Sequence, residues 1–250
     1  MQNLPLPVSQ TDDPAQRWAE SPHGRRLVSL ERSEVARQLP DLFGRHFLQI
    51  GHWGGEGDWL TGSEMLHRAV LMLGKQAGAQ ARVDARQLPL AAKSIDALLL
   101  PHTLESVASP HRLLRESSRV LSDRGRLLLL GFNPWGGLGW RRRLGLAPRA
   151  LPSAARFYSA GRVCDWLRLL DFEIVEVRRF GIGFPWLSPH SEGGPFTPAQ
   201  LLRPFGEVYL IAAKKQVIPL RLIGRPVRAQ IKPLMGTAGA TAHRDHGNPG

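Results

Sequence analysis

The stretch "RVDARQLPLAAKSIDALLLPHTLESVASPHRLLRESSRVLSDRGRLLLLGFNP", residues 82–134, decides which fold the sequence can form. It contains two almost wholly apolar runs, residues 94–100 and 125–132, and a strand of that kind must be covered on both faces. Between them, residues 109–121 carry leucines and valine on one side and charges on the other, which predicts a helix beginning at Ser109 and Pro110. A strand, a helix and a second strand in this order indicate a parallel sheet with helices packed on it.

The same alternation continues on both sides of this stretch. Further strands are predicted at residues 46–50, 67–73, 81–85, 172–180 and 207–215, and a further helix over residues 159–171. The fold class is therefore α/β, with a mostly parallel sheet and helices on both faces. In such sheets, ligands bind beyond the carboxyl ends of the strands, at the point where the strand order reverses.

The chain divides into three parts. Residues 1–41 are an N-terminal extension in which residues 1–23 are expected to lack regular structure and residues 24–39 to form one helix, with Leu30, Val35 and Leu39 at helical spacing. Residues 42–216 form the predicted domain, in which residues 133–158 and 181–206 are expected to be long loops. Residues 217–250 are basic and rich in Pro and Gly, which predicts a disordered tail.

Composition excludes several classes of protein. The single cysteine, Cys164, excludes an internal disulfide framework and a multi-cysteine zinc site. No segment reaches the eighteen or so apolar residues of a membrane helix and no signal peptide is recognisable, so we expect a cytoplasmic protein with no membrane partner. The net charge of +12 is concentrated in residues 126–164, which contain no acidic residue, and in residues 214–250.

Residues 82–134 resemble the class I S-adenosylmethionine-dependent methyltransferases, and in particular the bacterial type 11 methyltransferase-domain family. The matching positions follow one another in the family's order: Asp84, "LPL" at 88–90, "KSID" at 93–96, Leu104, Val107, Pro110, Glu116, "RVL" at 119–121 and Gly125. The resemblance implies a Rossmann-like, seven-stranded sheet over about residues 42–216. It also implies S-adenosyl-L-methionine as the cofactor.

In this family the glycine turn after the first strand holds the methionine part of the cofactor. The corresponding stretch here is "FLQIGHWGGEG", residues 47–57, in which Gly51 and Gly55 match the first and last glycines and His52 the variable position. Gln49 stands where the family has an acid, and Trp53 stands where it has the middle glycine. The Trp53 indole would either fill the space beside the cofactor or swing out and widen the turn. The alternative is a plain turn at the edge of the sheet, with Trp53 packed into the core.

The resemblance also assigns the adenosine side of the site. Asp84 and Ala85 correspond to residues that contact adenine, with an N-cap on the following turn as the alternative role of Asp84. The family's ribose-binding acid at the end of the second strand is replaced by Lys75 or Gln76, and Glu64 is another possible substitute.

His102, after the fourth strand, is the candidate for proton transfer and for contact with the cofactor. Its side chain is the titratable group there with a pKa suited to neutral pH, although a hydrogen-bonded structural histidine is an open alternative. Glu105 corresponds to a glutamate common in the family, or caps a helix. Asp96 is expected to serve the edge of the sheet.

Residues after the fifth strand are candidates for the acceptor pocket. Asn133, Trp135 and Trp140 would line its mouth with one amide and two aromatic walls, unless they form a proline-stopped turn over the core. Arg141–Arg143 could bind an anionic acceptor or nucleic acid, with a solvated surface run as the alternative. His190 and Trp186 are candidates for a lid.

Three functions remain open at this point. The first is a methyltransferase that acts on a small acceptor, and the second is a cofactor-free relative that serves as a binding or regulatory module. The third is an RNA methyltransferase, supported only by the arginine-rich stretches and the basic tail. No metal is expected, because His111, His243 and His246 have no partners at ligand spacing. The oligomeric state is left open.

Overall fold

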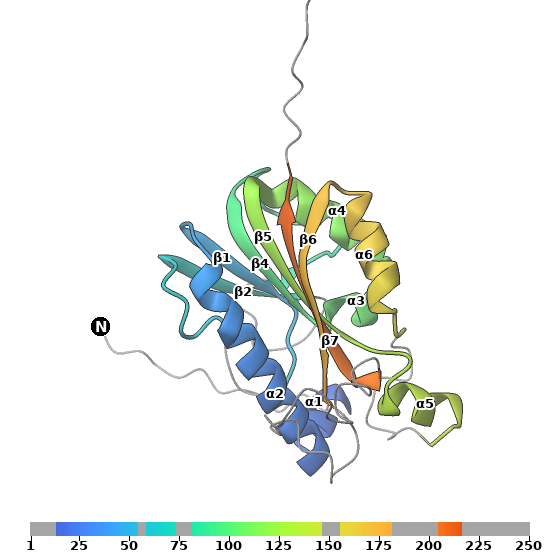
Figure 1. Cartoon of the computed structure of the whole chain (residues 1–250). Coiled ribbons are helices and arrows are strands. Elements are labelled where there is room, and N and C mark those ends of the chain that lie inside the picture. Colours follow the sequence, from blue (N-terminus) through green and yellow to red (C-terminus); the bar gives the residue numbers. More distant parts are fainter. Residues whose placement is uncertain (1–13, 55–58, 74–81, 147–155, 182–204, 217–250) are drawn as a thin grey trace, which may run out of the picture. The chain divides into compact units, whose positions relative to one another are not determined.

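Seven strands form one sheet in the order β3-β2-β1-β4-β5-β7-β6 (Figure 1). The computed structural model describes residues 14–54, 59–73, 82–146, 156–181 and 205–216, all within the unit Met1–Val217. The strands are β1 (His46–Ile50), β2 (His67–Leu73), β3 (Arg82–Val83), β4 (Ile95–Pro101), β5 (Leu121–Phe132), β6 (Phe172–Phe180) and β7 (Val208–Lys215).

The first five strands run parallel and β7 runs antiparallel to both of its neighbours. The strand order reverses between β1 and β4, so the carboxyl ends of these two strands mark the switch point. The predicted fold class, an α/β protein with a seven-stranded and mostly parallel Rossmann-like sheet, is confirmed.

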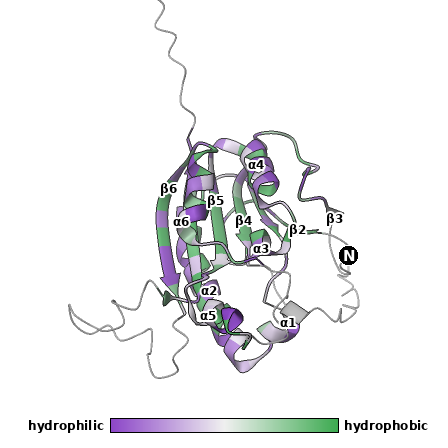
Figure 2. Cartoon of the chain, turned by 90° about the vertical axis from the view of Figure 1, so that its right-hand side faces the viewer, coloured by the Kyte–Doolittle hydropathy of each residue, from purple (hydrophilic) through white to green (hydrophobic). Residues whose placement is uncertain are grey.

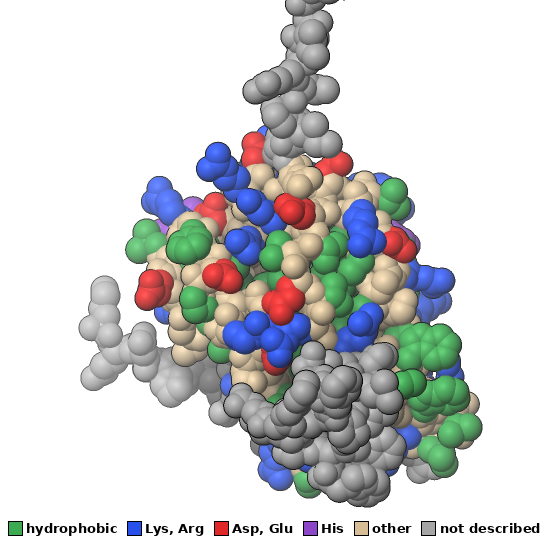
Figure 3. Space-filling view, viewed as in Figure 1, with side chains coloured by type: hydrophobic (Ala, Val, Ile, Leu, Met, Phe, Trp, Pro, Cys, Tyr) green, Lys and Arg blue, Asp and Glu red, His purple; other side chains and the backbone are tan. Residues whose placement is uncertain are grey.

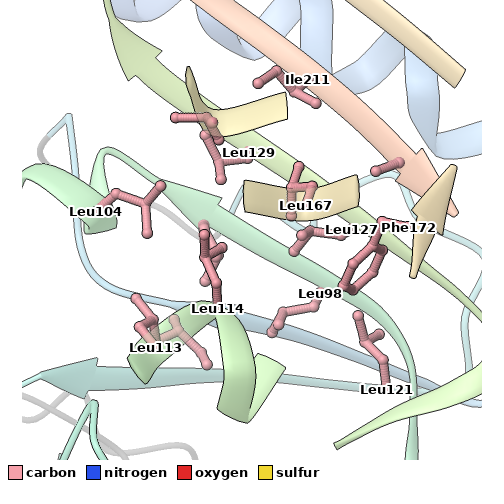
Figure 4. Close-up of a cluster of buried hydrophobic side chains, with 14 of the residues drawn as sticks. Leu98, Leu104, Leu113, Leu114, Leu121, Leu127, Leu129, Leu167, Phe172 and Ile211 are labelled. Carbon is pink, nitrogen blue, oxygen red and sulfur yellow. The ribbon is translucent and has the colours of Figure 1, made fainter. Parts of the chain in front are cut away.

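Helices cover both faces of the sheet because the central strands are apolar on both sides (Figure 2). Leu98 and Leu100 of β4 join a core with helices α4 (Pro110–Val120) and α6 (Ala160–Arg168), which Figure 4 shows in close-up. Ala97 and Leu99 face the opposite side. There they meet residues of helices α1 (Pro14–Ala19), α2 (Pro22–Gln38) and α5 (Gly137–Arg143).

Helix α2 begins earlier than predicted, and its buried face differs from the predicted one in its first turns, while Val35 and Leu39 are buried as expected. Its N-cap is Ser21, whose hydroxyl accepts from the Gly24 amide, and Pro22 takes the first helical position. The buried face is Gly24, Leu27, Val28, Glu31, Val35 and Gln38, while Leu30 is only half-buried. The apolar pattern was therefore placed on the wrong residues at the start of the helix.

Two predictions of irregular structure were wrong. Residues 14–19 form α1, held to the rest of the unit by the buried Trp18, and α5 lies within the predicted loop 133–158 and is anchored by the buried Leu138. Each is a short helix fixed by one large apolar side chain, a signal too small for periodicity to detect. The predicted lid and the tail lie outside the described residues, whose helices include none long and apolar enough to cross a membrane.

Candidate functional site

The turn at the carboxyl end of β1 adopts a backbone that glycine favours. Gly51 has a φ of 95°, and its amide donates to the carbonyl of Leu71 in β2 over 2.8 Å. A Cβ at Gly51 would lie 2.7 Å from Oγ1 of Thr103, which itself donates to the carbonyl of Ile50. The turn is thus tied to both β2 and the residues that follow β4.

Gln49 takes a structural role at the position where the family has an acid. Its side chain is fully buried in β1. The amide nitrogen donates to the Gly51 carbonyl over 3.0 Å, and the amide oxygen accepts from the Trp59 amide over 3.2 Å. An amide can both donate and accept, whereas a carboxylate can only accept, so Gln49 braces both sides of the turn.

The Trp53 indole is buried in the core, beside the residues at the carboxyl ends of β4 and β5. Its ring lies 4.4 Å from His102, 5.3 Å from Phe132 and 5.6 Å from Trp18, measured between ring centroids. Its Nε1 donates over 2.8 Å to a carboxylate oxygen of Glu31 in α2. Of the placements that the sequence left open, the structure has the one in which Trp53 packs into the core.

His102 lies between two buried carboxylates. Its Nε2 is 2.9 Å from Glu31 and its Nδ1 is 2.9 Å from Glu105, and all three side chains are almost completely buried. The second oxygen of Glu105 accepts from the backbone amide of Phe132. The backbone of His102 is left-handed, with φ 51°, which costs roughly 1 kcal/mol in a non-glycine residue, and the surrounding bonds hold it there.

This arrangement makes His102 a cation at neutral pH. Burial alone lowers the pKa of His102, but the carboxylates of Glu105 and Glu31 together outweigh it and raise the pKa to about 9. Since both ring nitrogens point at carboxylates, the imidazole has no lone pair ready to accept a proton. The predicted proton transfer by His102 stays a prediction, and this geometry favours the structural alternative.

The adenosine side of the predicted site is open to solvent. Asp84 follows β3, is exposed, and accepts from the Arg86 amide over 2.8 Å, so it also caps the turn. Ala85 is half-buried against the core, while His52 and Glu64 are exposed. Gly55, Lys75 and Gln76 lie outside the described residues, as do His190 and Trp186.

The acceptor-side candidates differ in burial. Asn133 is buried: its amide nitrogen donates to the Gly206 carbonyl and its oxygen accepts from the Trp135 amide. Trp135 and Trp140 are instead about half exposed, with Arg143 stacked against both rings. Their predicted roles in binding an acceptor are untested. Asp96, as expected, serves the sheet edge by accepting from the amides at the start of β1.

Sequence reasoning missed Glu31, the residue that links α2 to both Trp53 and His102. The signal was present, since Glu31 falls between Val28 and Val35 on the apolar face of the helix. A lone acid on such a face is informative because it must find a partner inside. Within the part of the chain that the structure describes, no group of His, Cys, Asp or Glu could hold a metal ion.

A parallel sheet that ends in an antiparallel strand pair, with a positive-φ glycine after β1, defines the class I methyltransferase fold. A family model for the methyltransferase domain matches residues 60–129. The uncharacterized protein YafS of Escherichia coli K12 is 35% identical over 222 residues, covering 87% of this chain and 88% of YafS. The chain therefore belongs to the class I S-adenosylmethionine-dependent methyltransferase family, in its type 11 methyltransferase-domain branch, and YafS is a relative of it.

Solved structures agree on the fold. A methyltransferase from Thermotoga maritima, described as a possible histamine N-methyltransferase, has a TM-score of 0.56 at 23% identity and covers 80% of this chain and 93% of its own. The cyclase SpnF has a TM-score of 0.52 at 16% identity, covering 77% and 82%. At such identities the likeness concerns the fold alone, and the second protein is a reminder that one fold hosts different chemistries.

Proposed function

We propose that the protein binds S-adenosyl-L-methionine at the carboxyl ends of β1 and β3 and transfers its methyl group to a small acceptor. The observation that carries the proposal is the glycine turn at the switch point: Gly51 keeps a positive φ and has no side chain, directly where the strand order reverses. The described residues fit such a cofactor, because Asp84 also presents an exposed carboxylate after β3.

In this proposal the glycine turn with Gly51 and His52 holds the methionine part, and Asp84 and Ala85 hold the adenine. The bound cofactor would supply a methyl group on a sulfonium sulfur that leaves as a neutral thioether. Alignment of the acceptor is then the main task of the protein. The buried His102 serves alignment by fixing Trp53 and Glu31, not by moving a proton.

A second function, that of a cofactor-free module, is favoured by the aromatic side chains that fill the space beside the glycine turn. Trp53, His102 and Phe132 pack ring against ring at the carboxyl ends of β1, β4 and β5. If these rings occupy the volume that the methionine part of the cofactor requires, the fold acts as a cofactor-free binding or regulatory module.

Calorimetric titration with S-adenosylmethionine and with its demethylated product separates the two functions. Asp84→Asn is the informative variant, since it keeps the turn-capping oxygen that accepts from Arg86 and removes the charge. We expect about ten-fold weaker cofactor binding from the loss of one charge-assisted hydrogen bond.

The matched control is Asp123→Asn. Asp123 lies near the amino end of β5, at the opposite edge of the sheet, where it pairs with Lys93. Cofactor affinity should not change in this variant. No heat of binding at millimolar cofactor would overturn the enzyme proposal and leave the binding module.

A further inference from the structure

The most unusual surface of the described residues surrounds α5. Four large apolar side chains are exposed within twelve residues: Trp135 at 51%, Trp140 at 47%, Leu144 at 66% and Leu146 at 69%. Arg141 and Arg143 are exposed among them. Figure 3 shows hydrophobic side chains gathered in the region of α5, and we refer to these six residues as the α5 patch.

The backbone beneath the α5 patch is firmly built. Leu138 is fully buried, and a Cβ on Gly136 or Gly139 would collide with backbone atoms of residues 206–207 or 134. The helix ends in a Schellman motif: the Leu146 amide donates to the Arg141 carbonyl and the Gly145 amide to that of Arg142, with Gly145 at φ 70°. The two leucines are therefore held on the outside by defined hydrogen bonds.

The positive charge of Arg141 and Arg143 in the α5 patch favours an anionic partner. Residues 126–164 contain no acidic side chain, so nothing in this segment neutralises its arginines. Exposed Trp and Leu beside Arg are the composition of surfaces that insert into the interface of an anionic bilayer. Tryptophan prefers the headgroup level, leucine the acyl boundary and arginine the lipid phosphates.

Nucleic acid fits the same surface less well. Bases stack on open aromatic faces. Here the Arg143 guanidinium already lies 4.5 Å from the Trp135 ring centroid and 5.5 Å from that of Trp140. RNA binding also gives no reason for Leu144 and Leu146 to be exposed, whereas a bilayer does.

We propose that the α5 patch docks the protein onto an anionic lipid bilayer, with Trp140, Leu144 and Leu146 entering the interface and Arg141 and Arg143 meeting lipid phosphates. The partner is thus a membrane surface, in contrast to the expectation drawn from the sequence. The proposal is independent of cofactor binding, because none of these residues lies in the glycine turn or beside Asp84.

Co-sedimentation of the full chain with vesicles tests the proposal. Vesicles of phosphatidylcholine with phosphatidylglycerol should bind the protein, phosphatidylcholine alone should bind it weakly, and added salt should weaken the binding. Both Trp140→Ser/Leu144→Ser/Leu146→Ser and Arg141→Glu/Arg143→Glu should reduce binding at least about ten-fold. These side chains are exposed, so circular dichroism should show an unchanged fold.

The matched control is Phe43→Ser/Leu169→Ser, which removes two apolar side chains that are even more exposed, elsewhere on the surface. It should bind vesicles as the unchanged protein does. The proposal is overturned if the full chain ignores anionic vesicles, or if the patch variants bind them undiminished. Binding of single-stranded RNA that the patch variants abolish, without vesicle binding, would also overturn it.

Discussion

Two regions of the sheet are covered by helices in different ways. We call the helix that packs on a region its cover: α4 for β4 and β5, and α2 for β1. Between β4 and β5 the chain forms α4, which buries Leu113, Leu114 and Val120 on the sheet it connects. Between β1 and β2, the described residues 51–54 and 59–66 form turns and no helix. That face is covered by α2, which precedes β1 in the chain.

The difference shows in which groups are buried. The cover over β4 and β5 is almost wholly apolar, with Ser117 satisfied within its own helix. The cover over β1 buries Glu31, which contacts His102 and through it Glu105. Gln49 is buried on its own, bonded to the turn after β1. Helix α2, which precedes β1 and is not part of the β1–β2 connection, is thus held on the sheet by a polar network. Breaking this network is costly, because a buried charge without its partner has lost its hydration and gains no compensating interaction.

The largest effect is expected from His102→Ala. The variant leaves Glu31 and Glu105 as buried carboxylates without their cation, which should lower the free energy of unfolding by about 3–5 kcal/mol. The control is His111→Ala in α4, an exposed ring that contacts Trp166 at a tilted angle, with an expected loss below about 1 kcal/mol. Urea unfolding measures the free energy of unfolding of both variants. If His102→Ala and His111→Ala lower it equally, the polar network does not distinguish the cover over β1 from the cover over β4 and β5.

The same network predicts a pH dependence of stability. The folded pKa of His102 is about 9, above its unfolded value of 6.5. Its contribution is therefore fully present below about pH 6.5 and is lost as pH rises through about 9, in total about 3 kcal/mol. Unfolding free energies from about pH 6 to about pH 10 should show this decline. His102→Gln should flatten it, and a variant that keeps the same slope would assign the decline to other groups.

How far the sequence predicted these two regions depended on how local the signal was. The alternation of apolar strands and helices predicted β4, α4 and β5 within a few residues, because each is defined by its own periodicity. Gly51 was singled out by the resemblance of its turn to the glycine turn of the family, and the structure adds that its φ is positive. The Glu31–His102–Glu105 cluster joins residues far apart in the chain, and no local pattern pairs them. The exposure of Trp135 and Trp140 was likewise a property of packing, not of sequence.

A smaller effect is expected from Trp53→Phe. Phenylalanine keeps most of the ring packing against His102 and Phe132 but loses the bond from Nε1 to Glu31. The loss of one hydrogen bond to a buried carboxylate should cost about 2 kcal/mol. Trp166→Phe on α6, whose ring packs against His111 and Tyr158, is the matched change and should cost less than about 1 kcal/mol. Thermal unfolding of both variants decides whether the Glu31 bond matters.

The smallest change in the free energy of unfolding is expected from removing the N-caps of α2 and α6, one helix from each face of the sheet. Ser21 caps α2 by accepting from the Gly24 amide over 3.1 Å, and its hydroxyl also donates to the Trp18 carbonyl, which joins α2 to α1. Ser159 caps α6 through one longer contact of 3.4 Å with the Arg162 amide. Ser21→Ala should therefore cost about 1–2 kcal/mol and Ser159→Ala about 0.5 kcal/mol, measured by urea unfolding. The reverse order would show that α2 is held by its buried network alone, so that its cap contributes little to the cover over β1.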